Sequence, residues 1–237
     1  MRVLELWRYP VKSMQGERLE VAEAGPDGLV GDRGWALVDQ ATGLGLTARR
    51  VPDLLFAAGR RRPDGAAEVV LPGGAATTDD AVLSDWLGRP VALRQAGSVA
   101  APHYESPDDD ELSDPPGWHE WQGAGGPFHD IATARISLVT TGTLGTWDRR
   151  RFRANVVLDG SGENALGGAL VRLGGAVLEV NDPIARCVMV TRPQSGGIGR
   201  DTSVLKTIHR QHGGDLAMGA QVRTPGTVRT GDELVPG

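Results

Sequence analysis

Glycine is the residue that most limits how this chain can fold. It occurs 34 times among 237 residues, about twice its usual share of roughly 7%. Because glycine is favoured in tight turns, this frequency predicts many turns and therefore many strands. The expected strands are short and too irregularly spaced for βαβ alternation, with three or four helices between them. The sequence therefore predicts an α+β fold that is mostly β and barrel-like.

Alternation of apolar and polar residues locates the expected strands. The first begins at Val3 and ends at Pro10, and a hairpin is expected between 34–39 and 44–49 across the turn at 40–43. Further strands are expected at 17–23, 68–71, 91–95, 136–140, 152–158, 170–180 and 184–191, with two more within 220–234.

Helix signals occur at three places. The segment 78–87 has Thr78 as its expected N-cap, two aspartates at its positive end and Gly88 directly after it. A short helix is expected just after Thr140. A third helix is expected after Asp201, which would cap it, and it carries an apolar face.

Residues 97–130 differ from the rest of the chain, because proline, glycine and acidic residues crowd the stretch 104–127. Long loops of this kind are usually functional lids or disordered segments. Trp118, Trp121 and Phe128 argue against plain disorder. Two interpretations stay open: the aromatic side chains anchor the loop on the body of the protein, or the loop is a lid that closes over a pocket.

Charge and cysteine content exclude several classes of protein. The net charge of −5 argues against non-specific binding of nucleic acid, which needs a basic face. A single cysteine excludes an internal disulfide framework and fits a reducing compartment. The first residues show no signal peptide, and no apolar run is long enough to span a bilayer. We therefore expect a cytoplasmic protein with neither a nucleic acid nor a membrane as partner.

The one cysteine, Cys187, follows Arg186 in a run of apolar residues. A thiolate is a good ligand for a soft or high-valent metal, and a neighbouring cation favours the ionised form. The alternative is that Cys187 is simply a small residue of the core. The common catalytic signatures G-x-S-x-G, H-E-x-x-H, C-x-x-C and the Walker loop are missing from the sequence.

Four short clusters place lysine, arginine or asparagine at expected strand ends. Together they offer guanidinium groups for phosphate, an amide for ring edges and one thiolate for a metal, which is what a polyanionic cofactor rich in hydrogen-bonding groups needs. A solvated surface turn explains any one cluster, but four such coincidences are less well explained in that way. The clusters are Tyr9-Pro10-Val11-Lys12-Ser13, Gly31-Asp32-Arg33-Gly34-Trp35, Arg151-Phe152-Arg153-Ala154-Asn155 and Arg186-Cys187.

With the Thr-Ala-Arg segment at 47–49 and Thr191 four residues after the cysteine, these clusters resemble the MOSC-domain proteins (molybdenum cofactor sulfurase C-terminal domain) that carry an MOSC N-terminal β-barrel domain. Among characterised relatives, the sequence is similar to the amidoxime-reducing components and their bacterial counterparts. The resemblance covers essentially the whole chain. It implies a smaller β-rich N-terminal domain at 1–96, a long loop or linker at 97–130 and a barrel-like MOSC domain at 131–237, with the two domains packed as one unit.

The resemblance also implies a molybdenum cofactor, Mo-molybdopterin, with Cys187 as the metal ligand and catalytic residue. It implies that Lys12, Ser13 and Arg33 hold the phosphate and pterin, that Arg153 and Asn155 contact them from the second domain, and that Thr140 and Thr141 line the pocket. Arg186 either helps to keep Cys187 ionised or points away along the strand.

The implied activity is reduction of small N-hydroxylated or related oxo substrates by oxygen-atom transfer to molybdenum. Because no flavin or iron–sulfur motif is found, a separate electron-donor protein is implied as a partner. The alternatives are a carrier of the cofactor or of persulfide sulfur, and a scaffold that binds no cofactor. The sequence departs from the family pattern at two places. Ala154 stands in place of proline, which is expected to loosen the turn without removing ligands. The segment Val190-Thr191-Arg192-Pro193-Gln194 lacks the acid of the family pattern, which bears on the substrate range more than on cofactor binding.

Overall fold

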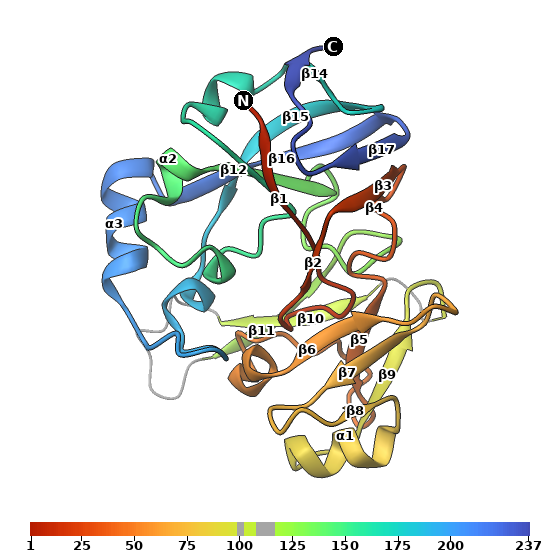
Figure 1. Cartoon of the computed structure of the whole chain (residues 1–237). Coiled ribbons are helices and arrows are strands. Elements are labelled where there is room, and N and C mark those ends of the chain that lie inside the picture. The colour runs from red at the N-terminus through yellow and green to blue at the C-terminus, as the bar shows by residue number, and fades with distance from the viewer. Residues whose placement is uncertain (99–101, 108–116) are drawn as a thin grey trace.

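An eight-stranded sheet occupies one half of the molecule (Figure 1) in the computed structural model, which describes residues 1–98, 102–107 and 117–237. Neighbouring strands are antiparallel except for one parallel pair, β12 and β13. Across the sheet the order is β18 (Leu234–Pro236), β14 (Leu170–Leu173), β15 (Ala176–Ala185), β16 (Asp215–Thr224), β12 (Ile136–Thr140), β13 (Val156–Leu158), β1 (Val3–Arg8) and β2 (Glu17–Leu19).

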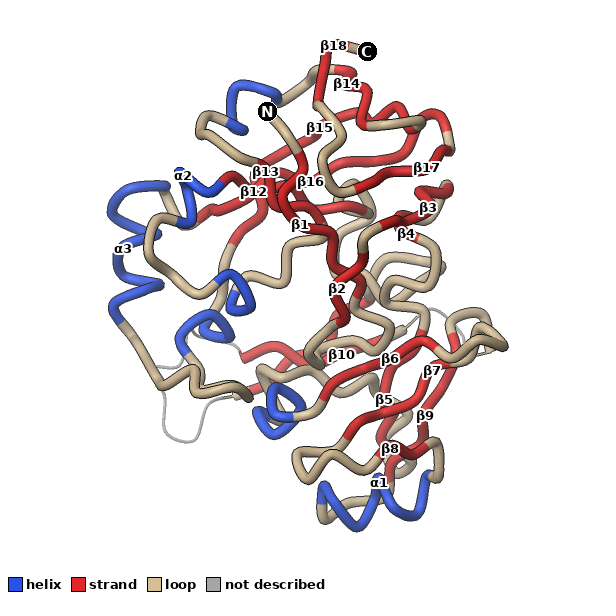
Figure 2. Tube along the Cα trace, viewed as in Figure 1, coloured by secondary structure: helices blue, strands red, loops and turns tan. Residues whose placement is uncertain are grey.

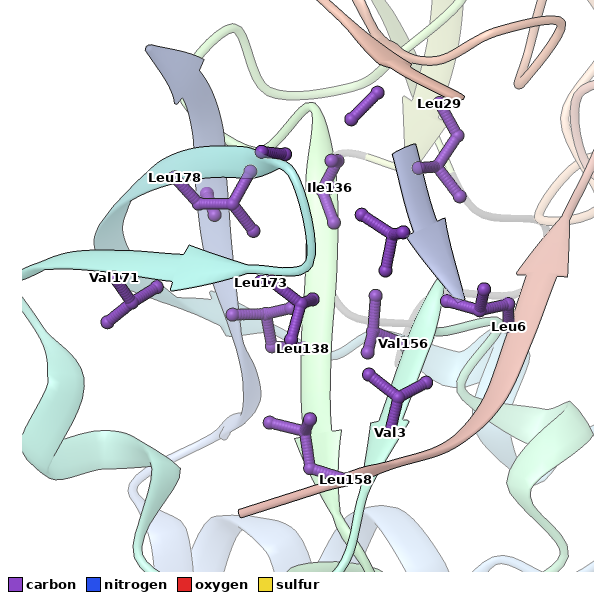
Figure 3. Close-up of a cluster of buried hydrophobic side chains, with 14 of the residues drawn as sticks. Val3, Leu6, Leu29, Ile136, Leu138, Val156, Leu158, Val171, Leu173 and Leu178 are labelled. Atoms are coloured by element: carbon purple, nitrogen blue, oxygen red, sulfur yellow. The ribbon is translucent and has the colours of Figure 1, made fainter. Parts of the chain in front are cut away.

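The core of this half is an apolar cluster packed between the sheet and smaller strands (Figure 3). Leu138 on β12 is fully buried there, beside Val156 of β13 and Leu6 of β1. A second, three-stranded sheet contributes to the same core and has the order β17 (Gly226–Arg229), β3 (Val21–Gly25) and β4 (Gly28–Leu29).

The other half is built from three small sheets and one helix (Figure 2). Two of these sheets and the helix enclose a separate apolar core that includes Val11 and Leu37, and the third sheet packs in a smaller cluster with Tyr104, Trp121 and Phe128. The three sheets are β5 (Trp35–Asp39) with β9 (Val91–Gln95), β6 (Ala58–Arg61) with β7 (Ala67–Val70) and β8 (Ala76–Thr77), and β10 (His103–Pro107) with β11 (Trp118–Gln122).

Helices are few, as expected for a fold that is mostly β. The α-helices are α1 (Asp80–Leu87), α2 (Thr141–Leu144) and α3 (Ser203–His212), and the 3-10 turns are η1 (Pro52–Phe56), η2 (Arg149–Arg151), η3 (Glu163–Leu166) and η4 (Val188–Thr191). The structure confirms α1 and its left-handed Gly88 cap, but Asp79 caps its first turn in place of Thr78. Among the described helices, none is long and apolar enough to cross a membrane.

Several expectations about strands differ from the structure: the expected strand 170–180 is two strands, β14 and β15, and the one at 152–158 begins only at Val156. The predicted loop 97–130 contains the β10–β11 hairpin, in which Tyr104 pairs with Trp121. The predicted hairpin 34–49 is confirmed in part: it keeps its tight turn and an antiparallel bridge between Val38 and Gly45, and β5 pairs in addition with β9. The predicted strand 184–191 ends at Ala185, and η4 follows it. Contacts distant in sequence decided these outcomes, and a local apolar pattern does not specify them.

The first residues of the chain belong to the half that holds the eight-stranded sheet. Leu6 of β1 pairs with Val156 of β13, and Ala22 of β3 pairs with Val228 of β17. Since sheets take strands from both ends of the chain, secondary structure does not test the predicted division into 1–96 and 131–237, which stays a prediction.

Candidate functional site

A cavity of about 400 Å³ lies where the two halves meet, and residues from both line it. Seven of the nine site residues predicted from the sequence contribute to its wall. They are Lys12, Ser13, Arg33, Arg153, Asn155, Arg186 and Cys187. These residues are distant in sequence, so their convergence is a property of the fold.

Thr140 and Thr141 do not line this cavity, so the prediction for them was wrong. Thr140 is fully buried; its hydroxyl donates to Glu163 at 2.6 Å and accepts from the backbone N–H of Thr143. Thr141 is exposed and donates to the carbonyl of Gly160 at 3.4 Å. The reason is that β12 ends in the N-terminus of α2, where the Thr140 hydroxyl serves as the cap.

Backbone strain is concentrated at the cavity. Within the described part of the chain, four non-glycine residues have a positive φ, and three of them are cavity residues: Ser13 at 67°, Arg33 at 49° and Arg153 at 52°. Such conformations cost about 1–3 kcal/mol each and persist only where the surroundings enforce them. The strain indicates that these side chains are held in place for a purpose other than stability.

Arg33 is anchored by three contacts with the protein. It pairs with Asp32, donates to Asn155 Oδ1 at 3.1 Å and donates to the Arg153 carbonyl at 3.1 Å. Asn155 is buried and also accepts from the backbone N–H and hydroxyl of Ser137 at 3.1 and 3.0 Å. The Asn155 amide therefore positions Arg33, whereas the sequence predicted that it contacts the cofactor directly.

Lys12 already has a counter-ion. Its ammonium group donates to the Phe128 carbonyl at 3.0 Å, pairs with Asp130 and lies 4.2 Å from the centre of the Tyr104 ring. Burial lowers the pKa of Lys12, and Asp130 offsets part of that effect. The Lys12 side chain is 6% exposed whereas that of Asp130 is 64% exposed, so the carboxylate is the accessible member of the pair.

Cys187 is half-buried at the N-terminal cap of η4 and lines the cavity. The neighbouring Arg186 guanidinium donates to the carbonyls of Leu216, at 2.7 Å, and Phe152, at 3.1 Å. Burial lowers the pKa of Arg186 to about 10, and the proximity of Cys187 opposes that shift. Arg186 therefore fixes the turn that presents Cys187, because its hydrogen bonds go to backbone carbonyls.

The charge of the cavity is strongly positive although the chain is acidic overall. Six of its described lining residues are lysine or arginine, and Asp130 is the one carboxylate among them. Sequence reasoning gave no site role to Arg49, Arg151 or Asp130. Arg49 belongs to the Thr-Ala-Arg segment and Arg151 to the Arg-Phe-Arg-Ala-Asn cluster, so a signal existed for both. Asp130 could be identified only from its spatial position beside Lys12.

Several buried polar atoms in the cavity wall have no hydrogen-bond partner. Within the described residues these include Thr47 Oγ1, Trp121 Nε1 and His129 Nε2. Burial, with a smaller effect from Arg33, lowers the pKa of His129 to about 3, so the imidazole is neutral at physiological pH. Because buried polar groups normally find partners, this wall fits a ligand that carries both negative charge and many hydrogen-bonding groups.

Two family models match the chain. The model of the MOSC N-terminal beta barrel domain covers residues 1–87, and the model of the MOSC domain covers residues 125–235. The chain belongs to the MOSC family. MOSC domains are known to bind the molybdenum cofactor. The donor set of the cavity fits such a group, because it combines guanidinium groups, unpartnered polar atoms and one thiol.

Solved structures of related architecture are distant in sequence. The YuaD protein from Bacillus subtilis is 12% identical, with 98% of this chain and 93% of that chain covered and a TM-score of 0.43. YiiM from Geobacillus stearothermophilus is 16% identical (57% and 72% covered, TM-score 0.37), and YiiM from Escherichia coli is 18% identical (46% and 56% covered, TM-score 0.35). A comparison with curated proteins gave no match. The family assignment therefore depends on the two domain models.

Proposed function

We propose that this MOSC protein holds the molybdenum cofactor in the cavity between its two halves and reduces N-hydroxylated or related oxo compounds. The observation that carries the proposal is the convergence of Cys187 with Arg33 and Arg153 in one electropositive cavity. When bound, the cofactor would supply two-electron oxygen-atom-transfer chemistry.

Different residues of the cavity would hold different parts of the cofactor. Cys187 offers the thiolate that would bind the metal, and η4 together with Arg186 fixes its position. Arg153, which lines the cavity and makes no hydrogen bond to another described residue through its side chain, is the free cation for the phosphate. Thr47, Trp121 and His129 offer polar atoms for the heterocycle. A negatively charged group is favoured throughout by the excess of cations.

The residues of the opening have a second task, which is to admit the substrate. Asp130 is the accessible carboxylate, and an ionised carboxylate accepts hydrogen bonds from N–H groups. Trp121 of β11 and Phe128 also line the cavity, so the hairpin segment contributes apolar surface to the wall. The acidic stretch of the predicted lid 104–127 lies largely outside the described residues, and the lid stays a prediction.

The first test measures molybdenum and pterin per chain, by elemental analysis and oxidised-pterin fluorescence, in protein from a cofactor-competent host. We expect near one of each in the wild type and loss of the metal in Cys187→Ser. Arg150→Gln is the control, because Arg150 pairs with Asp148 and does not line the cavity. Metal retained by Cys187→Ser at the wild-type level would contradict the ligand assignment.

The second test measures turnover. Loaded protein should reduce a hydroxylamine or an amidoxime when a chemical reductant replaces the electron-donor protein, and Cys187→Ser should not. A loaded wild type that binds metal and pterin but reduces neither compound would contradict the reductase proposal and support the carrier alternative.

A further inference from the structure

Arg153 carries a buried charge that the described protein leaves without a counter-ion. The residue is 8% exposed, and its guanidinium makes no hydrogen bond or ion pair with any other described residue. Burial, followed by the charge of Arg33, lowers the pKa of Arg153 to about 10. A buried cation is costly unless something compensates its charge. Its strained φ of 52° shows that the fold nevertheless enforces this placement.

An aromatic ring compensates part of this charge, in addition to the coulombic attraction of Asp32 and Asp130. The guanidinium carbons of Arg153 and Arg33 both lie 4.9 Å from the centre of the Tyr9 ring. The electron-rich face of an aromatic ring attracts a cation, and the attraction is strongest where water is excluded. Burial raises the pKa of Tyr9 above its ordinary value, so the hydroxyl stays protonated and the ring interacts through its face.

The Tyr9 ring is itself held rigidly. The residue is 3% exposed, and its hydroxyl donates to the Ala154 carbonyl at 3.3 Å. Its backbone N–H donates to Asp32 Oδ1 at 2.7 Å, and its carbonyl accepts from the Arg33 N–H at 2.7 Å. These contacts tie the ring to the segments that carry both arginines. The two like charges repel each other, and the ring that both guanidinium groups contact offsets part of that repulsion.

We propose that Tyr9 is a positioning residue: its ring holds the guanidinium groups of Arg153 and Arg33 together as a preorganised site for the phosphate ester of the cofactor. The inference rests on the proposed function, since it assigns one end of that cofactor to one part of the cavity. The ligand chemistry is a phosphate dianion, which can come from the cofactor or from free phosphate. Preorganisation raises affinity because the like charges are brought together before the anion arrives.

The test titrates inorganic phosphate into the full chain, purified from a host that cannot make the cofactor, and follows binding by calorimetry. The variants are Tyr9→Phe, a series with one, two and three fluorines on that phenylalanine ring, and Tyr9→Leu. Fluorine withdraws charge from the ring face with little change of shape, so affinity should fall stepwise along the series. We expect Tyr9→Phe to bind within about threefold of wild type and Tyr9→Leu to bind about tenfold or more weakly.

A purely space-filling role for the ring predicts the same affinity across the fluorinated series, and that result would overturn the proposal. The series keeps the test valid if Tyr9→Leu does not fold, because each fluorinated ring retains the size of phenylalanine. Arg150→Gln is the matched control: it removes one nearby guanidinium that does not line the cavity and should bind phosphate as the wild type does.

Loaded protein separates the two sources of phosphate. If the cofactor's phosphate occupies the site, loaded wild type should no longer bind inorganic phosphate, whereas phosphate binding unchanged by loading would overturn the assignment. Failure of the proposed function gives a different result: wild type from a competent host then contains neither molybdenum nor pterin, while the fluorination series still reports on Tyr9.

Discussion

The ion pair between Lys12 and Asp130 is a quantitative test of the electrostatics of the cavity. The Lys12 side chain is 6% exposed and that of Asp130 is 64% exposed. Removal of either partner therefore leaves an unpaired charge in a different environment. Asp130→Asn leaves a buried ammonium with the Phe128 carbonyl and the Tyr104 ring as its other contacts. Lys12→Met leaves a carboxylate that water can reach.

The magnitude follows from this difference in burial. A hydrogen bond to a charged group contributes about 1.5–3 kcal/mol, and exposure of one partner reduces it. We therefore expect Asp130→Asn to lower the free energy of unfolding by about 2 kcal/mol in the wild-type background. In the Lys12→Met background the same change should cost less than about 0.5 kcal/mol. The coupling in the double-mutant cycle is then about 1.5 kcal/mol.

The pH dependence has a definite sign. The folded pKa of Lys12 lies below its unfolded value of about 10.4, so the unfolded state binds more protons in that interval and stability rises with pH. Loss of Asp130 lowers the pKa of Lys12 in the folded state further, so the interval between the folded and unfolded pKa values of Lys12 becomes wider. The loss of unfolding free energy caused by Asp130→Asn should therefore shrink as the pH is raised from 7 towards 10.

Urea denaturation of the wild type, Lys12→Met, Asp130→Asn and the double variant at pH 7 and pH 9.5 measures the coupling free energy and its change with pH. The exposed pair of Arg2 and Glu233, with side chains 57% and 62% exposed, is the control, and its coupling should lie within about 0.2–1 kcal/mol. A coupling between Lys12 and Asp130 no larger than that of the control, or a deficit that grows with pH, would refute the reasoning.

Three further predictions concern stability. Leu138→Ala removes a fully buried side chain from the main core and should destabilise the fold by about 2–5 kcal/mol in urea denaturation, whereas a loss below 1 kcal/mol would show that the site collapses. Gly28→Ala should destabilise it because φ is +107° and a Cβ there would lie 2.4 Å from the Arg135 carbonyl oxygen; an unchanged melting temperature would contradict this. Wild-type stability should fall as the pH drops from about 6.5 towards 3, because the unfolded state protonates His129 first. His129→Gln should flatten that slope while His209→Gln, on the exposed face of α3, should not, and equal slopes would exclude His129 as the cause.

Short motifs contain most of the charged residues that the cavity brings together. Lys12, Arg33, Arg153 and Cys187 belong to clusters whose residue types already match the chemistry of a polyanionic, metal-bearing group, and the cavity brings all four together. The division of roles among them was not visible in sequence. Whether a cation is free or already paired depends on its neighbours in space, and Asp130 is 118 residues from the lysine that it neutralises.

The sequence by itself determined the fold class and the local stops, such as the helix that ends at Gly88, because turn chemistry and periodicity are local properties. Only the tertiary structure decided the full set of strand pairs, since β5 contacts the next segment through the Val38–Gly45 bridge and also pairs with the distant β9, which a local pattern does not specify. It also decided that the chain turns at Cys187 and does not continue as a strand, because Val190 packs against the α3 residues Val204 and Ile208. The apolar character of a residue predicts that it is buried, but the residues that pack against it depend on the whole fold.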